Sequence, residues 1–390
     1  MSKIVFFCIP ARGHTNPTLG VVRKLVSRGH EVWYYSYDCM RADIEAAGAR
    51  FVSCDRFDPQ TGLDAGAGER LGKDIAFSVE LIVSMTLAMD DAVVGEMKDL
   101  KPDVIVADSM AFWGRLIAAK LEIPFVSSVT TFAFNRYSAR VMKQGGGGLC
   151  SLLRALPRVR RSLERLRRKG YPVKNVFSII GNDNQTASVV YTSRQFQPCA
   201  DTFSDRYVFV GPSMRPVVRP MAKPGRPLVY ISLGTVVNRR PGFYRSCRDA
   251  FRDGAYQVIL SAGEQTDIAA LGPLPAGAEV YAHVDQMAVL QAADVFVTHC
   301  GMNSVNEALY NGVPLVLFPQ TPEQRGVANR TAQLGAGAFL EDASSAGIRR
   351  AVDAVYRTPA FRSAAREIAA GFHSCGGSDA AAQAIERAAR

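Results

Sequence analysis

The 390-residue chain is 48% hydrophobic, which suits two domains that each bury a full core and excludes a disordered chain. No apolar run reaches the roughly 18 residues of a membrane span, and the first strand is too short and wrongly flanked for a signal peptide, so we expect a cytoplasmic protein. The eight cysteines include no CxxC pair, so we expect reduced thiols and neither a disulfide framework nor a zinc site.

The formal net charge of +10 raises the possibility of a nucleic-acid partner, and much of this charge lies in residues 154–169. Arginines alternate there with leucine and valine at helical spacing, apart from Pro157, which predicts an amphipathic basic helix or a pair of helices. We interpret it as a solvated face over a packed one, with weak contact to an anionic membrane surface or an acidic acceptor as the alternative. No nucleic-acid module accompanies the charge, so we expect no nucleic-acid partner.

Strand and helix patterns alternate along the chain, which predicts an α/β fold with two parallel sheets that carry helices on both faces. The predicted strands are 3–9, 31–36, 50–53, 103–107, 124–128 and 188–192 in the first half, and 228–232, 257–261, 279–282, 295–298, 314–318 and 337–340 in the second. No GxGxxG follows the first strand, which disfavours a dinucleotide-binding dehydrogenase.

Residues 211–227 contain many prolines and almost no periodicity, which indicates a linker between the two halves. We therefore predict an N-terminal domain at 1–214, a linker at 215–226, a C-terminal domain at 227–375 and a final segment at 376–390. A ligand in such a protein would lie in the cleft between the halves.

Two titratable residues follow strands of the first half. His14 comes after the first strand and Asp108 after the strand 103–107, so both point to the rim where ligands of open α/β sheets bind. A histidine there can take a proton from a hydroxyl, while a carboxylate on its other nitrogen fixes the tautomer. Alternatively, His14 hydrogen-bonds near the start of a helix that Thr15 or Asn16 caps, and Asp108 caps another helix.

The stretch 295–324, VFVTHCGMNSVNEALYNGVPLVLFPQTPEQ, predicts an anion site. A buried strand ends at His299 and Gly301, just before a helical run at 303–311. Unpaired backbone N–H groups and the positive end of the helix dipole favour an anion at such a junction, and a diphosphate fits. Ser304 and Glu307 also have the spacing of a capping box, which would explain both of them without a ligand.

Several motifs occur in order along nearly the whole chain: IPARGHTNP, VYTSRQFQP, VFVGPS, VYISLGTV, HCGMNSVNEAL and PEQ. In them the chain resembles the UDP-dependent glycosyltransferases of family 1 with the GT-B fold, and more narrowly their bacterial macrolide-glycosyltransferase-like branch. The resemblance implies two Rossmann-like domains that face each other across a cleft, the first binding the acceptor and the second the nucleotide sugar. It also implies that the last helix, 379–389, packs back on the N-terminal domain.

The resemblance further implies an inverting transfer of a sugar from a UDP-sugar to a hydroxyl, with His14 as the base and Asp108 as its partner, and a β-glycoside as the product. No Asp-x-Asp motif ends a strand, so we expect neither a metal nor another cofactor. Implied donor contacts are Ser232, Gly234, Thr235, His283, Val284, Gln286, His299, Gly301, Asn303, Ser304, Glu307, Glu323 and Gln324. Within this set Glu307 would hold the ribose, and Glu323 with Gln324 the sugar hydroxyls, a pairing that usually accompanies glucose.

One motif departs from the family pattern. Where the family often has Trp-x-Pro-Gln, with the tryptophan stacked on uracil, this chain has His283, Val284, Asp285 and Gln286. The smaller imidazole should hold the base less firmly. We therefore expect UDP as the nucleotide and keep TDP as the alternative.

The acceptor is predicted only as a class. Five aromatic residues of the first half suggest an apolar or aromatic small molecule such as a polyketide, flavonoid or sterol, and are equally compatible with a core: Phe77, Phe112, Trp113, Phe132 and Phe134. Two rival functions use the same donor site. One is a nucleotide-sugar hydrolase or epimerase, and the other is a non-catalytic protein that binds nucleotide sugars.

Overall fold

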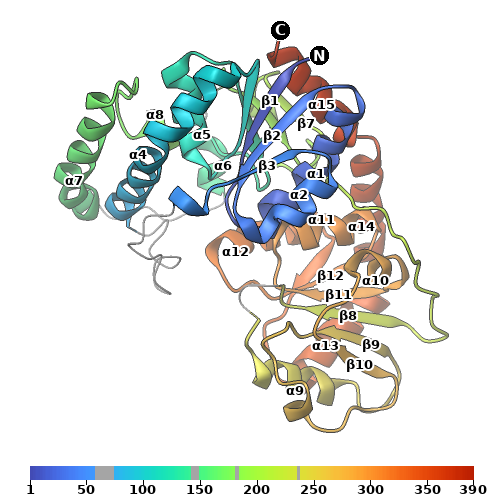
Figure 1. Cartoon of the computed structure of the whole chain (residues 1–390). Coiled ribbons are helices and arrows are strands. Elements are labelled where there is room, and N and C mark those ends of the chain that lie inside the picture. Colours follow the sequence, from blue (N-terminus) through green and yellow to red (C-terminus); the bar gives the residue numbers. More distant parts are fainter. Residues whose placement is uncertain (58–73, 142–148, 181–183, 235–237) are drawn as a thin grey trace.

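The computed structural model describes residues 1–57, 74–141, 149–180, 184–234 and 238–390. They form two parallel sheets, each covered by helices on both faces, which confirms the predicted α/β class (Figure 1). Every predicted strand is present, and its ends agree with the prediction within two residues. Among the described residues, no helix combines the length and the apolar character needed to cross a bilayer.

The first sheet has seven parallel strands in the order β3-β2-β1-β4-β5-β6-β7. The strands are β1 (Lys3–Phe7), β2 (Glu31–Ser36), β3 (Arg50–Ser53), β4 (Val104–Asp108), β5 (Phe125–Val129), β6 (Ala187–Val190) and β7 (Tyr207–Phe209). The helices are α1 (Arg12–Ser27), α2 (Arg41–Ala46), α4 (Ile75–Leu100), α5 (Phe112–Leu121), α6 (Arg136–Val141), α7 (Leu149–Arg168) and α8 (Phe177–Ile180). Strand β7 was not predicted, because three residues at the edge of a sheet show no period.

The second sheet has six parallel strands in the order β10-β9-β8-β11-β12-β13. The strands are β8 (Leu228–Ser232), β9 (Gln257–Ser261), β10 (Ala278–Tyr281), β11 (Val295–Thr298), β12 (Leu315–Leu317) and β13 (Gly337–Phe339). The helices are α9 (Pro241–Ala250), α10 (Gln286–Ala292), α11 (Met302–Tyr310), α12 (Pro322–Gln333), α13 (Ser345–Arg357) and α14 (Pro359–His373). The central strands β8 and β11 are buried along their whole length because helices cover both faces of the sheet, and each ends in a polar residue, Ser232 or Thr298.

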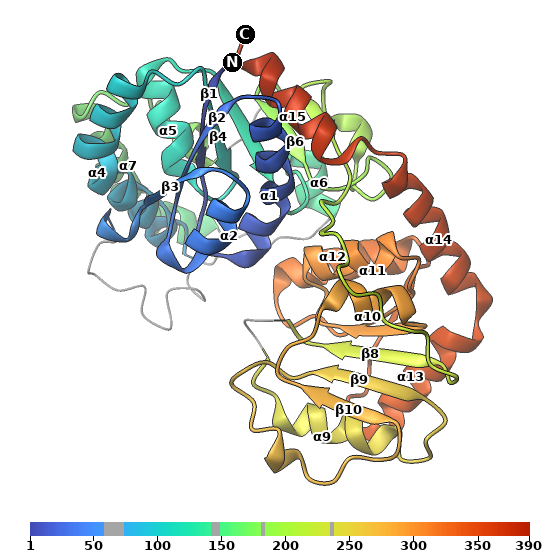
Figure 2. The ribbon, with the colours of Figure 1, turned by 45° about the vertical axis from the view of Figure 1, so that its right-hand side comes forward.

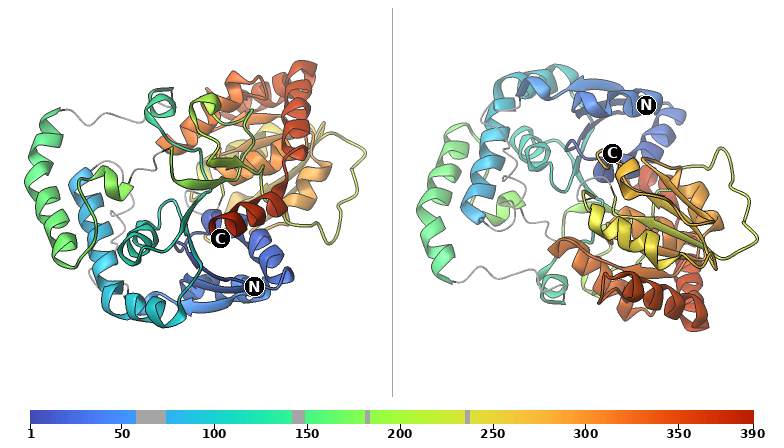
Figure 3. Two further views of the ribbon diagram at one scale, coloured as in Figure 1. Left: turned by 90° about the horizontal axis from the view of Figure 1, so that it is seen from above. Right: turned by 90° about the horizontal axis from the view of Figure 1, so that it is seen from below.

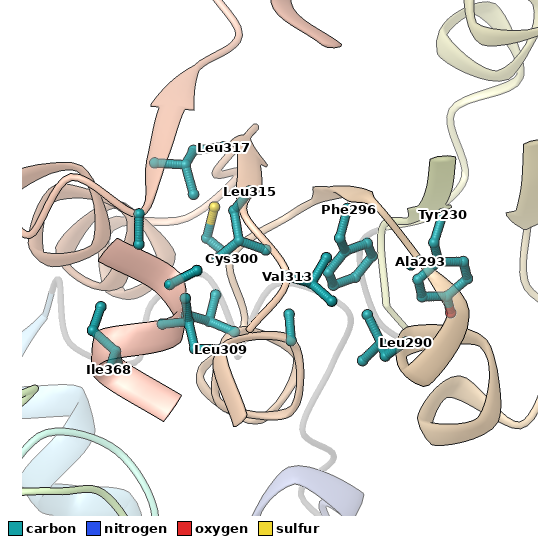
Figure 4. Packing of buried hydrophobic residues seen from close by; sticks show 14 of the residues in the cluster. Tyr230, Leu290, Ala293, Phe296, Cys300, Leu309, Val313, Leu315, Leu317 and Ile368 are labelled. Atoms are coloured by element: carbon teal, nitrogen blue, oxygen red, sulfur yellow. The ribbon is translucent and has the colours of Figure 1, made fainter. Parts of the chain in front are cut away.

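One hydrophobic core is shared by the two domains. On one face of the second sheet, Tyr230 stacks on Phe296 with ring centroids 4.7 Å apart, and leucines of β12 and α11 pack beside them (Figure 4). Phe132 and Phe196 of the N-terminal domain belong to the same cluster, and the ring of Phe196 lies 5.8 Å from that of Phe372 in α14. The relative position of the two sheets is therefore fixed by buried side chains.

The last helix, α15 (Gly377–Ala388), returns from the second domain and lies against α1 (Figures 1 and 2). Its apolar face, with Ile385 fully buried, completes the core under the first sheet. On its polar face, Asp379 and Glu386 form ion pairs with Arg28 at 2.8 and 2.9 Å. The N–H of Gly377 donates to the carbonyl of Val210 at 2.8 Å, so α15 begins beside the segment that leaves the first sheet.

The basic segment forms the single helix α7, with Pro157 inside it, packed along α4 at one edge of the molecule (Figure 3). Acidic residues of α4 pair with part of its charge, because Arg158 contacts Glu80 and Lys169 contacts Asp91 at 3.0 Å. The buried face consists of Ala155, Val159, Leu163 and Leu166. A packed face under a partly neutralised basic face agrees with the first interpretation, and contact with a membrane surface stays a prediction.

Removal of the shared core contact should destabilise the whole chain. We expect Phe196→Ala to lower the free energy of unfolding by about 3–5 kcal/mol, because it leaves a cavity between the domains. The matched control is Phe134→Ala, whose side chain is 37% exposed and which should change stability by about 0.5 kcal/mol or less. Urea denaturation measures both, and equal losses would contradict a shared interdomain core.

Candidate active site

Three polar side chains meet at the carboxyl edge of the first sheet, where β1, β4 and β5 lie side by side. His14 follows β1, Asp108 ends β4 and Thr130 comes directly after β5. His14 Nδ1 lies 2.8 Å from Asp108 Oδ2 and 2.9 Å from Thr130 Oγ1, and the hydroxyl also lies 3.3 Å from the same carboxylate oxygen. The structure thus brings the predicted pair together and adds a third group.

The hydrogen-bond pattern assigns the protons. An ionised carboxylate only accepts, so the Nδ1 of His14 carries its hydrogen and donates to Asp108, while the Thr130 hydroxyl donates to the carboxylate and accepts from Nδ1. The other oxygen of Asp108 accepts the N–H of Met110 at 2.8 Å, which holds the carboxylate in place. Nε2 of His14 is therefore left as the proton acceptor.

The alternative interpretations of this pair are wrong. Helix α1 begins at Arg12, with Ala11 as its N-cap, so neither Thr15 nor Asn16 caps it and His14 lies in its first turn. Asp108 accepts hydrogen bonds from His14 and from the N–H of Met110 in the turn after β4. Asp108 caps no helix, because Ala111 is the N-cap of α5, and the caps expected from Thr15 or Asn16 beside His14 are not formed.

The electrostatics of His14 involve both domains. Burial lowers its pKa, but the charge of Asp108 and their hydrogen bond outweigh burial, and the charge of Glu323 acts in the same direction. The net result is a pKa above the usual 6.5. Because Glu323 belongs to α12, the second domain lies close enough to influence the base.

The second sheet presents a helix start at its own carboxyl edge. Between β11 and α11, Cys300 has a positive φ of 67°, a conformation that costs energy for a residue with a side chain. Helix α11 begins at Met302 after Gly301, and no side chain among the described residues caps it. The predicted capping box of Ser304 and Glu307 is wrong, because Ser304 already lies inside the helix. The first N–H groups of α11 stay available to an anion.

Two glycines make room for the imidazole of His299. A Cβ on Gly234 would lie 2.5 Å from His299 Cε1, and one on Gly301 would lie 2.6 Å from Nε2. Gly234 also has a φ of 73°, which side-chain-bearing residues rarely adopt. Burial lowers the pKa of His299 to about 4, so the ring is neutral near pH 7. Gly234 and Gly301 were predicted as contacts of the nucleotide sugar. In the structure they leave the space that the His299 ring occupies.

Glu307 is held by a chain of hydrogen bonds. Tyr230 donates its hydroxyl to Gln286 Oε1 at 3.1 Å, and Gln286 Nε2 donates to Glu307 Oε2 at 2.5 Å. The same amide lies 3.3 Å from Ser304 Oγ. Burial raises the pKa of Glu307, and the hydrogen bond from Gln286 opposes that rise. Gln286 therefore orients Glu307 and Ser304 instead of standing free as a separate donor contact.

Two other predicted donor contacts already have partners. Gln324 Oε1 accepts the N–H groups of Gln320 and Thr321 at 2.8 and 3.2 Å, which forms a capping box at the start of α12. Only the NH₂ group of Gln324 is left for a sugar. Asn303 Nδ2 donates across the cleft to the carbonyl of Gly13 at 2.8 Å. Glu323, in contrast, is exposed.

The remaining predicted residues divide into surface, core and undescribed positions. Past β10, His283 is exposed, and Val284 is partly buried against the shared core. Thr235 lies outside the described residues.

Of the predicted acceptor contacts, Trp113 and Phe132 are core residues, 6% and 1% exposed, so they do not line an open acceptor site. Phe112 is partly buried, and Phe134 is exposed.

Thr130 was missed by the sequence analysis, although a signal for it exists. Both strands involved were predicted: the strand 103–107, which Asp108 follows, and the neighbouring strand 124–128, beyond which Thr130 lies. Polar residues that follow adjacent parallel strands lie together at one edge, so a search of all strand ends would have found it.

Comparison with known proteins agrees with this geometry. Residues 216–374 match the family model described as UDP-glucoronosyl and UDP-glucosyl transferase. The chain is 32% identical to the NDP-glycosyltransferase YjiC of Bacillus licheniformis over 98% of this chain and 96% of that protein. It is 33% identical to the demethyllactenocin mycarosyltransferase of Streptomyces fradiae over 87% of this chain and 76% of that protein.

Among solved structures, the calicheamicin glycosyltransferase CalG4 superposes with a TM-score of 0.82 at 29% identity, covering 100% of this chain and 98% of that one. The fold, the two strand edges and these relatives lead to one conclusion. The chain belongs to the family 1 UDP-dependent glycosyltransferases, which are enzymes of the GT-B fold.

Proposed function

We propose that the protein transfers glucose from UDP-glucose to a hydroxyl of a hydrophobic small molecule, with inversion at the anomeric carbon. The observation that carries this proposal is the placement of His14 opposite the helix start of the other domain. The Asn303 amide reaches the carbonyl of Gly13, next to His14, and the charge of Glu323 acts on the imidazole. A donor bound at α11 would therefore present its sugar to the base.

The reaction follows from the free nitrogen of His14. The acceptor hydroxyl gives its proton to Nε2 while its oxygen bonds to the anomeric carbon from the face opposite the diphosphate. The bond from that carbon to the diphosphate oxygen breaks, and its electron pair leaves with UDP. Asp108 stabilises the imidazolium that forms, and Thr130 holds the carboxylate in line with Nδ1. The product is a β-glycoside.

The donor side supports the leaving group without a metal. The N–H groups at the start of α11 and its dipole face the diphosphate, and His299 contributes as a neutral hydrogen-bond donor. Glu307, oriented by Gln286, would bind the ribose hydroxyls. Glu323 and the NH₂ group of Gln324 would bind the sugar. We expect turnover to persist in EDTA.

We infer the sugar and the acceptor from the side chains at the donor site and from the named relatives. The carboxylate of Glu323 beside an amide favours an array of equatorial hydroxyls, as in glucose. TDP-linked sugars are the alternative, because His283 stands where the family often has tryptophan and because one relative is named for mycarosyl transfer. Relatives named for demethyllactenocin and calicheamicin support a natural-product acceptor.

A panel of hydrophobic alcohols and phenols with several nucleotide sugars tests the proposed reaction, with mass spectrometry for products and NMR coupling constants for the linkage. We expect the fastest turnover with UDP-glucose and a β-linked glucoside. An α-linked product, or faster turnover with a TDP-deoxysugar or UDP-N-acetylglucosamine, would contradict the proposal. UDP release without any acceptor would favour the hydrolase.

Loss of the base should lower turnover without weakening donor binding. We expect His14→Ala to lose roughly a hundredfold or more in kcat, the usual range for a general base, with UDP affinity nearly unchanged. Asp108→Asn should be less severe, because the imidazole remains. Near-parental turnover of His14→Ala on an unactivated alcohol would exclude His14 as the base.

The pH dependence has a definite sign. The base must be neutral, so kcat/KM should fall as the pH drops through the pKa of His14, which lies above 6.5. Since Asp108 favours the imidazolium, Asp108→Asn should move this acid limb to lower pH. An acid limb that does not move in this variant would place the titrating group elsewhere.

The packing of His299 against Gly234 allows a test of His299 as a contact of the diphosphate. Gly234→Ala adds a methyl group where the imidazole lies and strains the backbone, so we expect UDP affinity to fall about tenfold or more. Gly242→Ala is the matched control, because nothing lies within 4 Å of the added Cβ. Calorimetric titration with UDP measures both, and unchanged affinity in Gly234→Ala would argue against His299 as a diphosphate contact.

A further inference from the structure

Among the described residues, the proposed donor contacts include no positively charged side chain. A nucleoside diphosphate leaves with several negative charges, yet His299 is neutral because burial lowers its pKa to about 4. Asn303 and Ser304 are neutral amide and hydroxyl groups, and Glu307 and Glu323 are acidic. The helix dipole of α11 is equivalent to only about half an elementary charge. A side-chain cation that serves the leaving group would therefore come from another part of the chain.

The linker brings a guanidinium to this place. A pocket between the start of α1, the linker and α11 is lined by Asn16, Tyr191, Arg215, Asn303, Asn306 and Glu307. Asn303 and Glu307 are four residues apart and share one face of α11, so the pocket follows the helix from its start toward the proposed ribose contact. Arg215 is exposed and, among the described residues, forms no ion pair.

A second feature of the pocket is a buried polar atom without a partner in the described part of the chain. Asn306 is 2% exposed, and its amide donates to the carbonyl of Tyr191 at 3.1 Å. Its Oδ1 has no hydrogen-bond partner among the described residues. A buried acceptor without a partner costs free energy, and a ligand hydroxyl that donates a hydrogen bond, such as one of a ribose, would satisfy it.

We propose that Arg215 binds the diphosphate of the nucleotide sugar and supplies the positive charge that the departing UDP requires. This inference rests on the donor site proposed above. A guanidinium suits the task because it is charged at every relevant pH and its planar fork matches two phosphate oxygens. Arg215 belongs to the linker and to neither sheet. The donor site would therefore consist of the linker together with residues at the strand ends.

A simpler role for Arg215 would be to balance Glu307. Burial raises the pKa of Glu307, and the charge of Arg215 opposes that rise. If this were its whole role, removal of Arg215 would disturb the ribose contact and weaken uridine and UDP alike. If Arg215 binds phosphate, only the phosphorylated ligand should respond.

The experiment therefore compares UDP with uridine on the full-length chain. Calorimetry gives the Kd of UDP and TDP, and ligand-observed NMR gives the weaker Kd of uridine, for the parent, Arg215→Ala, Arg215→Lys and Arg219→Ala. Arg219 is the matched control, an exposed linker arginine outside the pocket lining. Thermal unfolding of each variant checks that the fold is retained.

We expect Arg215→Ala to raise the Kd of UDP about tenfold or more, the usual cost of a charged hydrogen bond, and to leave the Kd of uridine unchanged. Arg215→Lys should lose less, and Arg219→Ala should match the parent. An unchanged Kd for UDP, or equal losses for UDP and uridine, would overturn the inference while the donor site stands. Failure of the parent to bind either nucleoside diphosphate would overturn the donor site, and this inference with it.

Discussion

The two strand edges face each other because a segment of the first domain is buried in the second. Arg330 of α12 donates to the carbonyls of Gln195 and Phe196 at 2.6 and 3.0 Å, and Asn306 of α11 donates to that of Tyr191 at 3.1 Å. The ring of Phe196 completes the core between the sheets. These contacts fix His14 on one domain against a helix start on the other. His14 lies at the edge of the first sheet and the start of α11 at the edge of the second, so the proposed transfer needs both edges.

Within that frame, two histidines are given opposite properties by their surroundings. His14 is buried beside a carboxylate, whose charge favours the protonated ring and raises its pKa. His299 is buried between glycines, and desolvation lowers its pKa to about 4 although a hydrogen bond with the backbone of Ser232 acts in the opposite direction. The first can accept a proton and hold it, whereas the second stays neutral and can only donate or accept a hydrogen bond. Environment therefore decides the role of each ring.

The fold and the pairing of His14 with Asp108 were predictable because they depend on local patterns. Strands buried on both faces appear as apolar runs, and the rule that ligands lie beyond strand ends brings His14 and Asp108 to one rim. Contacts between distant segments leave no such pattern. The hydrogen bond from Asn303 to Gly13 joins residues 290 positions apart, and neither residue type indicates the other.

The capping boxes show why local patterns also fail. Ser304 with Glu307 and Thr321 with Gln324 have the same spacing, yet only the second pair forms the box. Thr321 precedes Pro322, which begins α12, whereas α11 begins two residues before Ser304. A shift of this size in a helix start reverses the interpretation, and it is smaller than sequence patterns resolve. The Oε1 of Gln324 therefore belongs to the cap of α12, whereas the Glu307 side chain takes no part in a cap.

Side-chain NMR can determine whether Asp108 prepares His14 to act as a base. With five histidines in the chain, isotope-labelled imidazoles can be assigned by substitution and titrated individually. We expect a pKa above 6.5 for His14, with the hydrogen of the neutral ring on Nδ1, and a decrease in that pKa in Asp108→Asn. A pKa at or below 6.5, or a neutral ring protonated on Nε2, would contradict this expectation.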